Sequence, residues 1–206
     1  MTGQSGPARH RHRAGDPQDR AGDLPDRPGD LQDRAGDATD LVGEAPSPAD
    51  LAAVEASLGR PPAVGFTVVV RNERGAPAVI ANDPFLADAT PMPTRFWLVD
   101  PALHDAVSRL ESAGGVRQAE RDVDPKTLAD AHARYAAERD AAIPARHPGP
   151  RPSGGVGGTR QGVKCLHAHL AWWLAGGDDP VGAWTAGRLG LVADVAGSEH
   201  VGRAGR

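Results

Sequence analysis

The pattern of hydrophobic and polar positions divides the chain into a polar N-terminal part and a patterned remainder. Within residues 1–46, a seven-residue unit repeats as AGDPQDR, AGDLPDR, PGDLQDR and AGDATDL over residues 14–41. A coiled coil needs two apolar positions in every heptad, whereas each of these units offers at most one leucine and contains a glycine. Such a segment buries too little apolar surface to offset the entropy of ordering it. We therefore predict a disordered heptapeptide-repeat tail, with a docking arm for a partner as the alternative.

The first folded element is predicted to begin at Ser47. Ser47 is a good N-cap, a proline follows it at the first helical position, and Asp50 completes a capping pattern. Leu51, Val54 and Leu58 then recur at the spacing of one helical face. A glycine and two prolines follow and end this short helix.

Three short runs of β-branched and aromatic residues predict strands. Residues 66–70 (FTVVV) and 78–80 (AVI) flank a polar turn, and together they predict a hairpin. Residues 95–99 (RFWLV) predict a third strand. The PMPT sequence at 91–94 precedes this strand, and its two prolines restrict the backbone before it.

Helical periodicity predicts further helices in the second half of the chain. Asp-Pro pairs at 100–101 and 124–125 supply an N-cap followed by proline, so a helix is expected after each of them. Residues 163–174 (VKCLHAHLAWWL) predict the last well-defined helix, with Trp173 on its core face. A weaker helical pattern covers about residues 183–195.

These elements predict one α+β domain over residues 47–196. We expect a small antiparallel sheet of about three strands packed against three to five helices, with a frayed C-terminus at 197–206. Residues 144–162 are rich in Pro, Gly and Arg and show no periodicity. A loop of this length is usually either functional or flexible, so we predict a flexible loop inside the domain.

Composition and charge narrow the range of functions. The formal net charge is −4 over 206 residues, which argues against bulk attraction to nucleic acid or anionic lipid. Cys165 is the single cysteine, so no intramolecular disulfide can form. The N-terminus lacks the apolar run of a secretory signal, and no stretch approaches the about 20 apolar residues that span a bilayer. We therefore expect a cytoplasmic protein that binds neither nucleic acid nor membranes.

Three side chains within 163–174 are the candidate catalytic residues: Cys165, His167 and His169. On a regular helix Cys165 and His169 share a face, so the imidazole could help to generate a nucleophilic thiolate, whereas His167 points away. The same pair could begin a zinc site, but structural zinc needs four ligands and the chain has no second cysteine. The remaining alternative is a structural role, with a small thiol flanked by hydrogen-bonded histidines.

A second group of residues predicts a binding surface. Thr94, Arg95 and Trp97 follow the rigid prolines, and Lys164 and His167 lie at the start of the predicted last helix. We expect them to bind an unknown protein partner or a small anionic ligand. Three arginines of the flexible loop could contribute to an anion site: Arg146, Arg151 and Arg160.

Three stretches of the chain carry a resemblance to a known family. They are PADLAAVEASLGRPP at 48–62, PMPTRFWLVDP…SRLE at 91–111 and KCLH at 164–167. With these residues the chain resembles the DUF501 family, a domain of unknown function from high-GC bacteria, over about residues 48–183. The resemblance implies a small cytoplasmic α+β domain and no established activity.

The resemblance also implies that a metal site is lost in this chain. Family members typically carry a Cys-x-Cys-Gly turn after the first strand, which together with the cysteine of KCLH favours zinc binding. Here Asn72 and Arg74 stand at the two cysteine positions, while Gly75 and Pro77 are kept, and Ala89 replaces a glycine of the family's DGTPFPT loop. We therefore expect no metal site and no cofactor.

The absence of a complete catalytic set makes a non-enzymatic binding or regulatory module the leading hypothesis. One alternative is a small-molecule enzyme that uses Cys165 with a histidine, or Lys164 with the arginine loop. Another is the remnant of a zinc-binding domain. The deciding question is whether the loop at 91–97 lies beside Cys165 and His167.

Overall fold

The computed structural model of the chain describes residues 43–191. Most of the predicted repeat tail, the region 192–196 and the predicted frayed C-terminus lie outside these residues. At the start of the described residues, Gly43 packs beside Thr67, and the backbone N–H and C=O of Glu44 both bond to Val68 at 2.8 Å. The domain therefore includes residues ahead of the expected boundary at 47.

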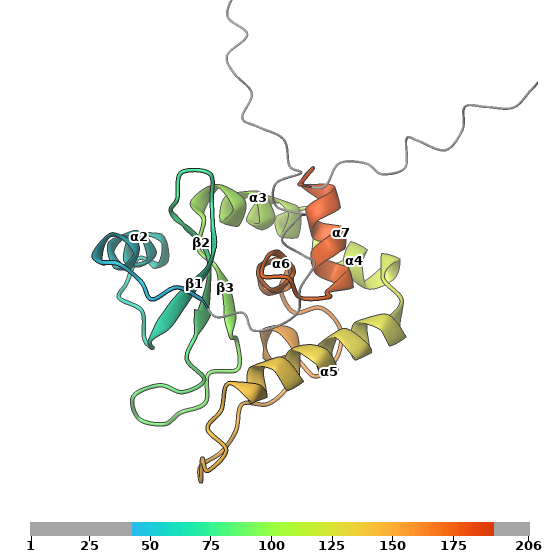
Figure 1. Cartoon of the computed structure of the whole chain (residues 1–206). Coiled ribbons are helices and arrows are strands. Elements are labelled where there is room, and N and C mark those ends of the chain that lie inside the picture. The colour runs from blue at the N-terminus through green and yellow to red at the C-terminus, as the bar shows by residue number, and fades with distance from the viewer. Residues whose placement is uncertain (1–42, 192–206) are drawn as a thin grey trace, which may run out of the picture.

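The described residues hold a three-stranded sheet, six α-helices and one short 3-10 helix (Figure 1). In chain order they are α2 (Pro48–Leu58), β1 (Phe66–Arg71), β2 (Pro77–Asn82), β3 (Phe96–Leu98), α3 (Pro101–Ser112), α4 (Gly115–Asp122), α5 (Pro125–Ala141), η1 (Val156–Gly158), α6 (Leu166–Leu174) and α7 (Pro180–Arg188). None of these helices is both long enough and apolar enough to cross a membrane.

The sheet has the strand order β1-β2-β3, and both pairs are antiparallel. Ile80 lies opposite Val68 on one side and opposite Trp97 on the other. Every residue of β2 is buried, because this central strand has a neighbour at each edge and helices over both faces. The predicted α+β class and the three-stranded antiparallel sheet are thus confirmed.

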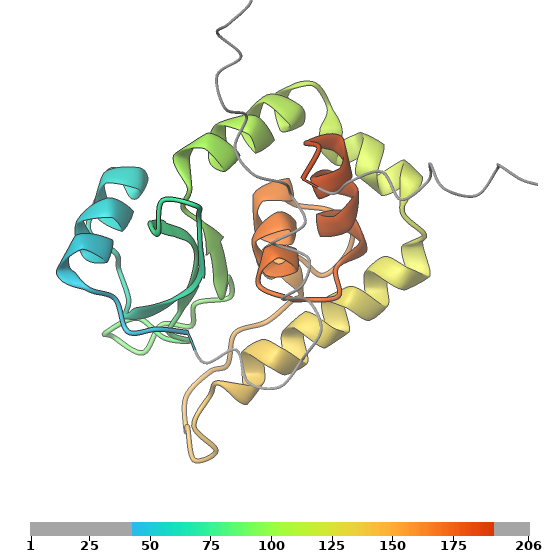
Figure 2. The same ribbon diagram turned by 45° about the horizontal axis from the view of Figure 1, so that its top comes forward.

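Helices cover the two faces of the sheet unequally (Figure 2). The helix α2 packs on one face, where Val54 joins a small core with four residues of the sheet region: Phe66, Val68, Ile80 and Val99. On the other face, α6 packs against the inward side chains of β2 and β3, including Val79, Phe96 and Leu98. The remaining helices surround α6, which makes it the central helix of the larger core.

The predicted helix starts are confirmed wherever the signal is a local cap. Ser47 and Asp50 form a reciprocal capping box at α2, and Asp100 and Asp124 accept backbone N–H bonds at the starts of α3 and α5. The prediction of the apolar face of α2 is partly wrong, because Leu51 is 45% exposed whereas Asp50 is buried. A tertiary contact holds the Asp50 side chain in this buried position, since the guanidinium of Arg71 on β1 bonds both of its carboxylate oxygens.

Helix α4 was not predicted, so the domain has six helices in place of the expected three to five. Its sequence, GVRQAERD, has few apolar residues, and only Gly115 and Ala119 are buried. The sequence has two glycines here, Gly114 and Gly115. Gly114 adopts φ 87°, a left-handed conformation that suits glycine, and the chain then turns directly into α4.

The last two helices differ in register from the sequence-based expectation. Helix α6 begins at Leu166, three residues later than predicted, and α7 begins at Pro180 with Asp179 as its N-cap. Trp172 is buried and Trp173 only half-buried, the reverse of the prediction. Helix α6 is apolar around most of its circumference, so periodicity alone does not determine which tryptophan faces the core.

Candidate functional site

The start of α6 places Cys165 in a different position from the one predicted. Cys165 is the N-cap residue, with an extended backbone at φ −161° and ψ 126°, and so it lies outside the helix. Its Sγ is 3.7 Å from Nδ1 of His167. The predicted pairing of Cys165 with His169 is therefore wrong, and His167 is the imidazole beside the thiol.

His169 is instead a core residue, only 1% exposed. Its Nδ1 lies 2.7 Å from the carboxylate of Asp179, which also accepts the backbone N–H groups of Val181 and Gly182 at the start of α7. Its Nε2 is buried and has no hydrogen-bond partner among residues 43–191. These contacts tie α6 to α7 and leave His169 no access to a substrate, so its role is structural.

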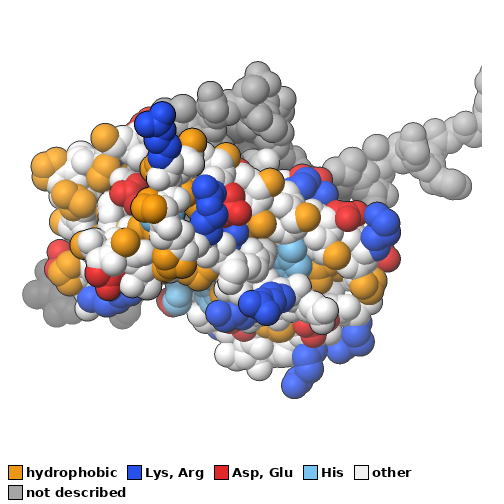
Figure 3. All heavy atoms as spheres, turned by 90° about the horizontal axis from the view of Figure 1, so that it is seen from below, with side chains coloured by type: hydrophobic (Ala, Val, Ile, Leu, Met, Phe, Trp, Pro, Cys, Tyr) orange, Lys and Arg blue, Asp and Glu red, His pale blue; other side chains and the backbone are white. Residues whose placement is uncertain are grey.

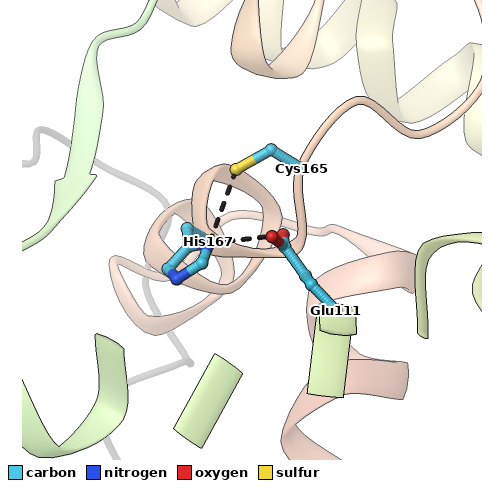
Figure 4. Close-up of side chains that lie close together, drawn as sticks. All are labelled: Glu111, Cys165 and His167. Carbon is cyan, nitrogen blue, oxygen red and sulfur yellow. Dashed lines mark hydrogen bonds and ion pairs between the residues drawn. The ribbon is translucent and has the colours of Figure 1, made fainter. Parts of the chain in front are cut away.

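A carboxylate that sequence reasoning missed completes the site beside Cys165. Glu111 lies in the last turn of α3, and its Oε1 is 3.2 Å from Nδ1 of His167. The same oxygen accepts the backbone N–H of Leu166, the first residue of α6. One ligand atom from each of Glu111, Cys165 and His167 lies within 4.8 Å of the other two (Figure 4). We call these three residues the seam cluster, because they join α3 to α6.

The far side of the His167 ring is also occupied. Its Nε2 lies 3.1 Å from the backbone carbonyl of His104 and 3.2 Å from Oγ of Ser108. A carbonyl oxygen can only accept a hydrogen bond, so Nε2 carries a proton. The Nδ1 atom faces the Glu111 carboxylate, which likewise favours a proton there. Both contacts therefore favour the imidazolium form of His167, which carries a proton on each ring nitrogen.

Electrostatics act on His167 in the same direction. Partial burial of the ring opposes protonation, but this effect is outweighed by the hydrogen bond and the electrostatic interaction with Cys165, the electrostatic interaction with Glu111 and the hydrogen bond to the His104 carbonyl. The pKa of His167 therefore lies above its ordinary value of 6.5. His132 on α5 contrasts with it: burial lowers its pKa, and its ring nitrogens accept from Val156 N–H and donate to the Gly162 carbonyl.

We expect the two histidines to titrate on opposite sides of pH 6.5, the ordinary histidine value. The raised pKa means that His167 contributes stability below about pH 6.5, which is lost as the pH rises through its folded pKa. The lowered pKa means that the stability linked to His132 is present above about pH 6.5 and is lost as the pH falls. NMR titration of the imidazole resonances, assigned with His167→Ala and His132→Asn, measures both values. The reverse order of the two pKa values would contradict the hydrogen-bond assignments.

The predicted binding loop at 91–97 is fixed against β2 and α5. The Arg95 backbone N–H donates to Oη of Tyr135 at 2.7 Å, and the Thr94 carbonyl accepts from the Asn82 side chain at 3.3 Å. Burial raises the pKa of Tyr135 to about 12, so its hydroxyl stays protonated. The Arg95 Nε is buried without a hydrogen-bond partner in the described region.

The remaining predicted binding residues do not gather at one site. Trp97 packs with the α2 core, whereas its neighbours Phe96 and Leu98 face α6 across the sheet. Lys164 is exposed, and its Nζ donates to the Gly157 carbonyl of η1 at 3.3 Å. Trp97 and His167 therefore belong to opposite sides of the sheet. The expected surface therefore does not include Trp97, while Pro93 of the loop and Lys164 both lie beside η1, so a surface formed by the rest of the loop and the helix start stays a prediction.

The arginine-rich loop is anchored at one end by a residue that the sequence did not single out. Arg139 is buried on α5, and its guanidinium bonds the carbonyls of Pro152 at 3.2 Å and Gly154 at 2.7 Å. The three arginines proposed for an anion, Arg146, Arg151 and Arg160, are all exposed. On the face shown in Figure 3, basic side chains are scattered among hydrophobic and acidic ones. Anion binding by this loop stays a prediction.

The chain matches the model of a known protein family. The model of the family described as "Protein of unknown function (DUF501)" matches residues 68–187, which is more than half of the 206-residue chain. No curated protein and no solved structure matches the chain. The matched range begins in β1 and contains the whole seam cluster, while α2 precedes it.

Proposed function

Because the chain belongs to the DUF501 family, whose function is unknown, we propose a role from the geometry of its site. The domain is a non-enzymatic binding or regulatory module, and the seam cluster is its ligand site. Cys165, His167 and Glu111 are all half-buried, so a small ligand can reach them from solvent.

The arrangement around His167 is the observation that carries this proposal. In a nucleophilic relay, one ring nitrogen takes the proton of the thiol or hydroxyl, and a carboxylate orients the ring through the other nitrogen. Here Cys165 and Glu111 both approach Nδ1, and the carbonyl of His104 occupies Nε2. The Glu111 carboxylate therefore shares Nδ1 with the thiol, and it does not orient the ring from the opposite nitrogen as in such a relay. Glu111, Cys165 and His167 each bring one donor atom to the same place, which is the arrangement expected of a ligand-binding site.

A second candidate function is an enzyme with Cys165 as its nucleophile. The 3.7 Å contact between the Cys165 Sγ and the His167 Nδ1 favours it, since an imidazolium beside sulfur stabilises a thiolate. The two functions differ in outcome, because a nucleophile forms a covalent intermediate with its substrate and a binding site does not.

Thermal shift measurements on the full chain test the binding module. We expect one ligand class among divalent metal ions, phosphate and simple carboxylates to raise Tm. The shift should disappear in His167→Ala and Cys165→Ser and persist in His147→Ala, a histidine control in the 144–162 loop. A ligand shift that is lost instead in Thr94→Ala or Arg95→Gln would place the site at the 91–97 loop and overturn the proposal. A covalent acyl adduct on Cys165 that turns over with activated esters would establish the enzyme in its place.

A further inference from the structure

We infer that the ligand of the seam cluster is a single divalent transition-metal ion of the Zn²⁺ type, held by Glu111, Cys165 and His167. The inference rests on the proposed function, because it names the ligand of the same site. It departs from the expectation that no metal site is retained. That expectation rested on the missing turn cysteines and did not include Glu111, which reaches the site from a helix far away in sequence.

The separations within the cluster match those around one tetrahedral ion. Zinc binds Cys sulfur at about 2.3 Å and His nitrogen or carboxylate oxygen at about 2.0–2.2 Å. At a tetrahedral angle these bond lengths place sulfur about 3.6 Å from nitrogen and nitrogen about 3.4 Å from oxygen. The corresponding separations here are 3.7 Å between Sγ and Nδ1 and 3.2 Å between Nδ1 and Oε1. The third separation, between the Cys165 sulfur and the Glu111 carboxylate, lies within 4.8 Å, against about 3.6 Å around such an ion, so one ion fits all three atoms once these two side chains move closer.

Two of the three ligands already have the partners that orient a metal ligand. A ligating histidine usually donates its other N–H to a carbonyl or carboxylate, which fixes the ring and its tautomer. The His167 Nε2–H has this partner in the His104 carbonyl, so Nδ1 is the nitrogen left for the ion once its proton departs. The Glu111 carboxylate is oriented in the same way by the backbone N–H of Leu166.

The donor types restrict the choice of ion. A thiolate and a carboxylate together neutralise a divalent cation, and a sulfur, nitrogen and oxygen set suits Zn²⁺ better than Mg²⁺ or Ca²⁺, which prefer oxygen ligands. Three protein ligands leave a fourth position for water or a further ligand.

Zinc loading of the full chain tests the inference. After incubation with Zn²⁺ and desalting, we expect about one zinc per chain by elemental analysis. Substitution with Co²⁺ should give the visible bands of a tetrahedral ion together with a thiolate-to-cobalt charge-transfer band. Cys165→Ser, His167→Ala and Glu111→Gln should each weaken zinc binding by about 100-fold or more, beyond the usual effect of losing a partner that only orients a ligand. His147→Ala should bind zinc like the parent chain.

A measurement on the unmodified chain keeps the inference testable if a variant fails to fold. Zinc at one equivalent should slow the reaction of Cys165 with a thiol reagent, and a chelator should restore the rate. No stoichiometric zinc and no protection of Cys165 would overturn the metal site. The binding module would still stand if another ligand depended on His167. Zinc bound equally by all three variants would be adventitious and would also overturn the inference.

Discussion

Replacing Asp179 with alanine is expected to lower the free energy of unfolding by about 3–5 kcal/mol, the usual cost of breaking a buried pair by removing one partner. The carboxylate is fully buried and accepts from His169 and from the backbone N–H groups of Val181 and Gly182. Alanine leaves these three donors buried without a partner, and it removes the N-cap of α7. Urea unfolding followed by far-UV circular dichroism measures the loss.

The neighbouring Asp178 provides the matched control. Its carboxylate is 83% exposed and pairs with Arg134 at 3.0 Å. An exposed pair of this kind contributes about 0–1 kcal/mol, so Asp178→Ala should be nearly neutral. Asp179→Asn keeps an acceptor for the two backbone N–H groups and should lose less than Asp179→Ala. Equal losses for Asp178→Ala and Asp179→Ala would contradict the buried position of the Asp179 side chain.

Trp172→Ala is expected to cost about 3–5 kcal/mol, the range for truncating a large aromatic side chain in a core. Trp172 is 2% exposed, packs edge-to-face with Tyr135 at 5.2 Å, and donates its Nε1–H to Glu138 at 2.7 Å. Burial already raises the pKa of Glu138, and the substitution removes the hydrogen bond that opposes this rise. Circular dichroism is the suitable probe, because the substitution alters tryptophan fluorescence directly.

Trp173→Ala tests the register of α6 at the next position. Trp173 is half-buried beside α7, so its truncation should cost less than that of Trp172, at about 1–2 kcal/mol. The sequence pattern alone placed Trp173 on the core face and therefore predicts the opposite order. A larger loss for Trp173→Ala than for Trp172→Ala would show that the helix is rotated from the register described above.

The sequence alone was sufficient to predict a structural element wherever the contacts that determine it are local. The helix starts at Ser47, Asp100 and Asp124 depend on hydrogen bonds between residues three apart, so their spacing in the chain already specifies them. The strands of the hairpin depend on β-branched runs around a short turn, which are equally visible in sequence. Most of the element types and the α+β class could be predicted for this reason.

Prediction failed where a segment's surroundings determine its structure. Helix α4 is short and mostly polar: Gly115 and Ala119 are buried and Val116 packs partly against the core, which leaves too few apolar positions to identify a helical face from sequence. Helix α6 has the opposite property: it is buried on most sides, so its apolar pattern does not define one face. The order of Trp172 and Trp173 followed from packing against α5 and α7.

The candidate site could likewise be predicted only in part. Cys165 and His167 could be identified as candidates from residue chemistry and their place near a helix start. That these two residues meet Glu111 could not be predicted, because the Glu111 carboxylate binds the N–H of Leu166, the first residue of α6, across 55 positions of the chain. With Leu166 as the first helical residue, Cys165 lies outside the helix and next to His167. Local sequence determined which donor groups the chain carries, and the packing of α3 against α6 decided which of them meet, because only tertiary contacts bring distant segments together.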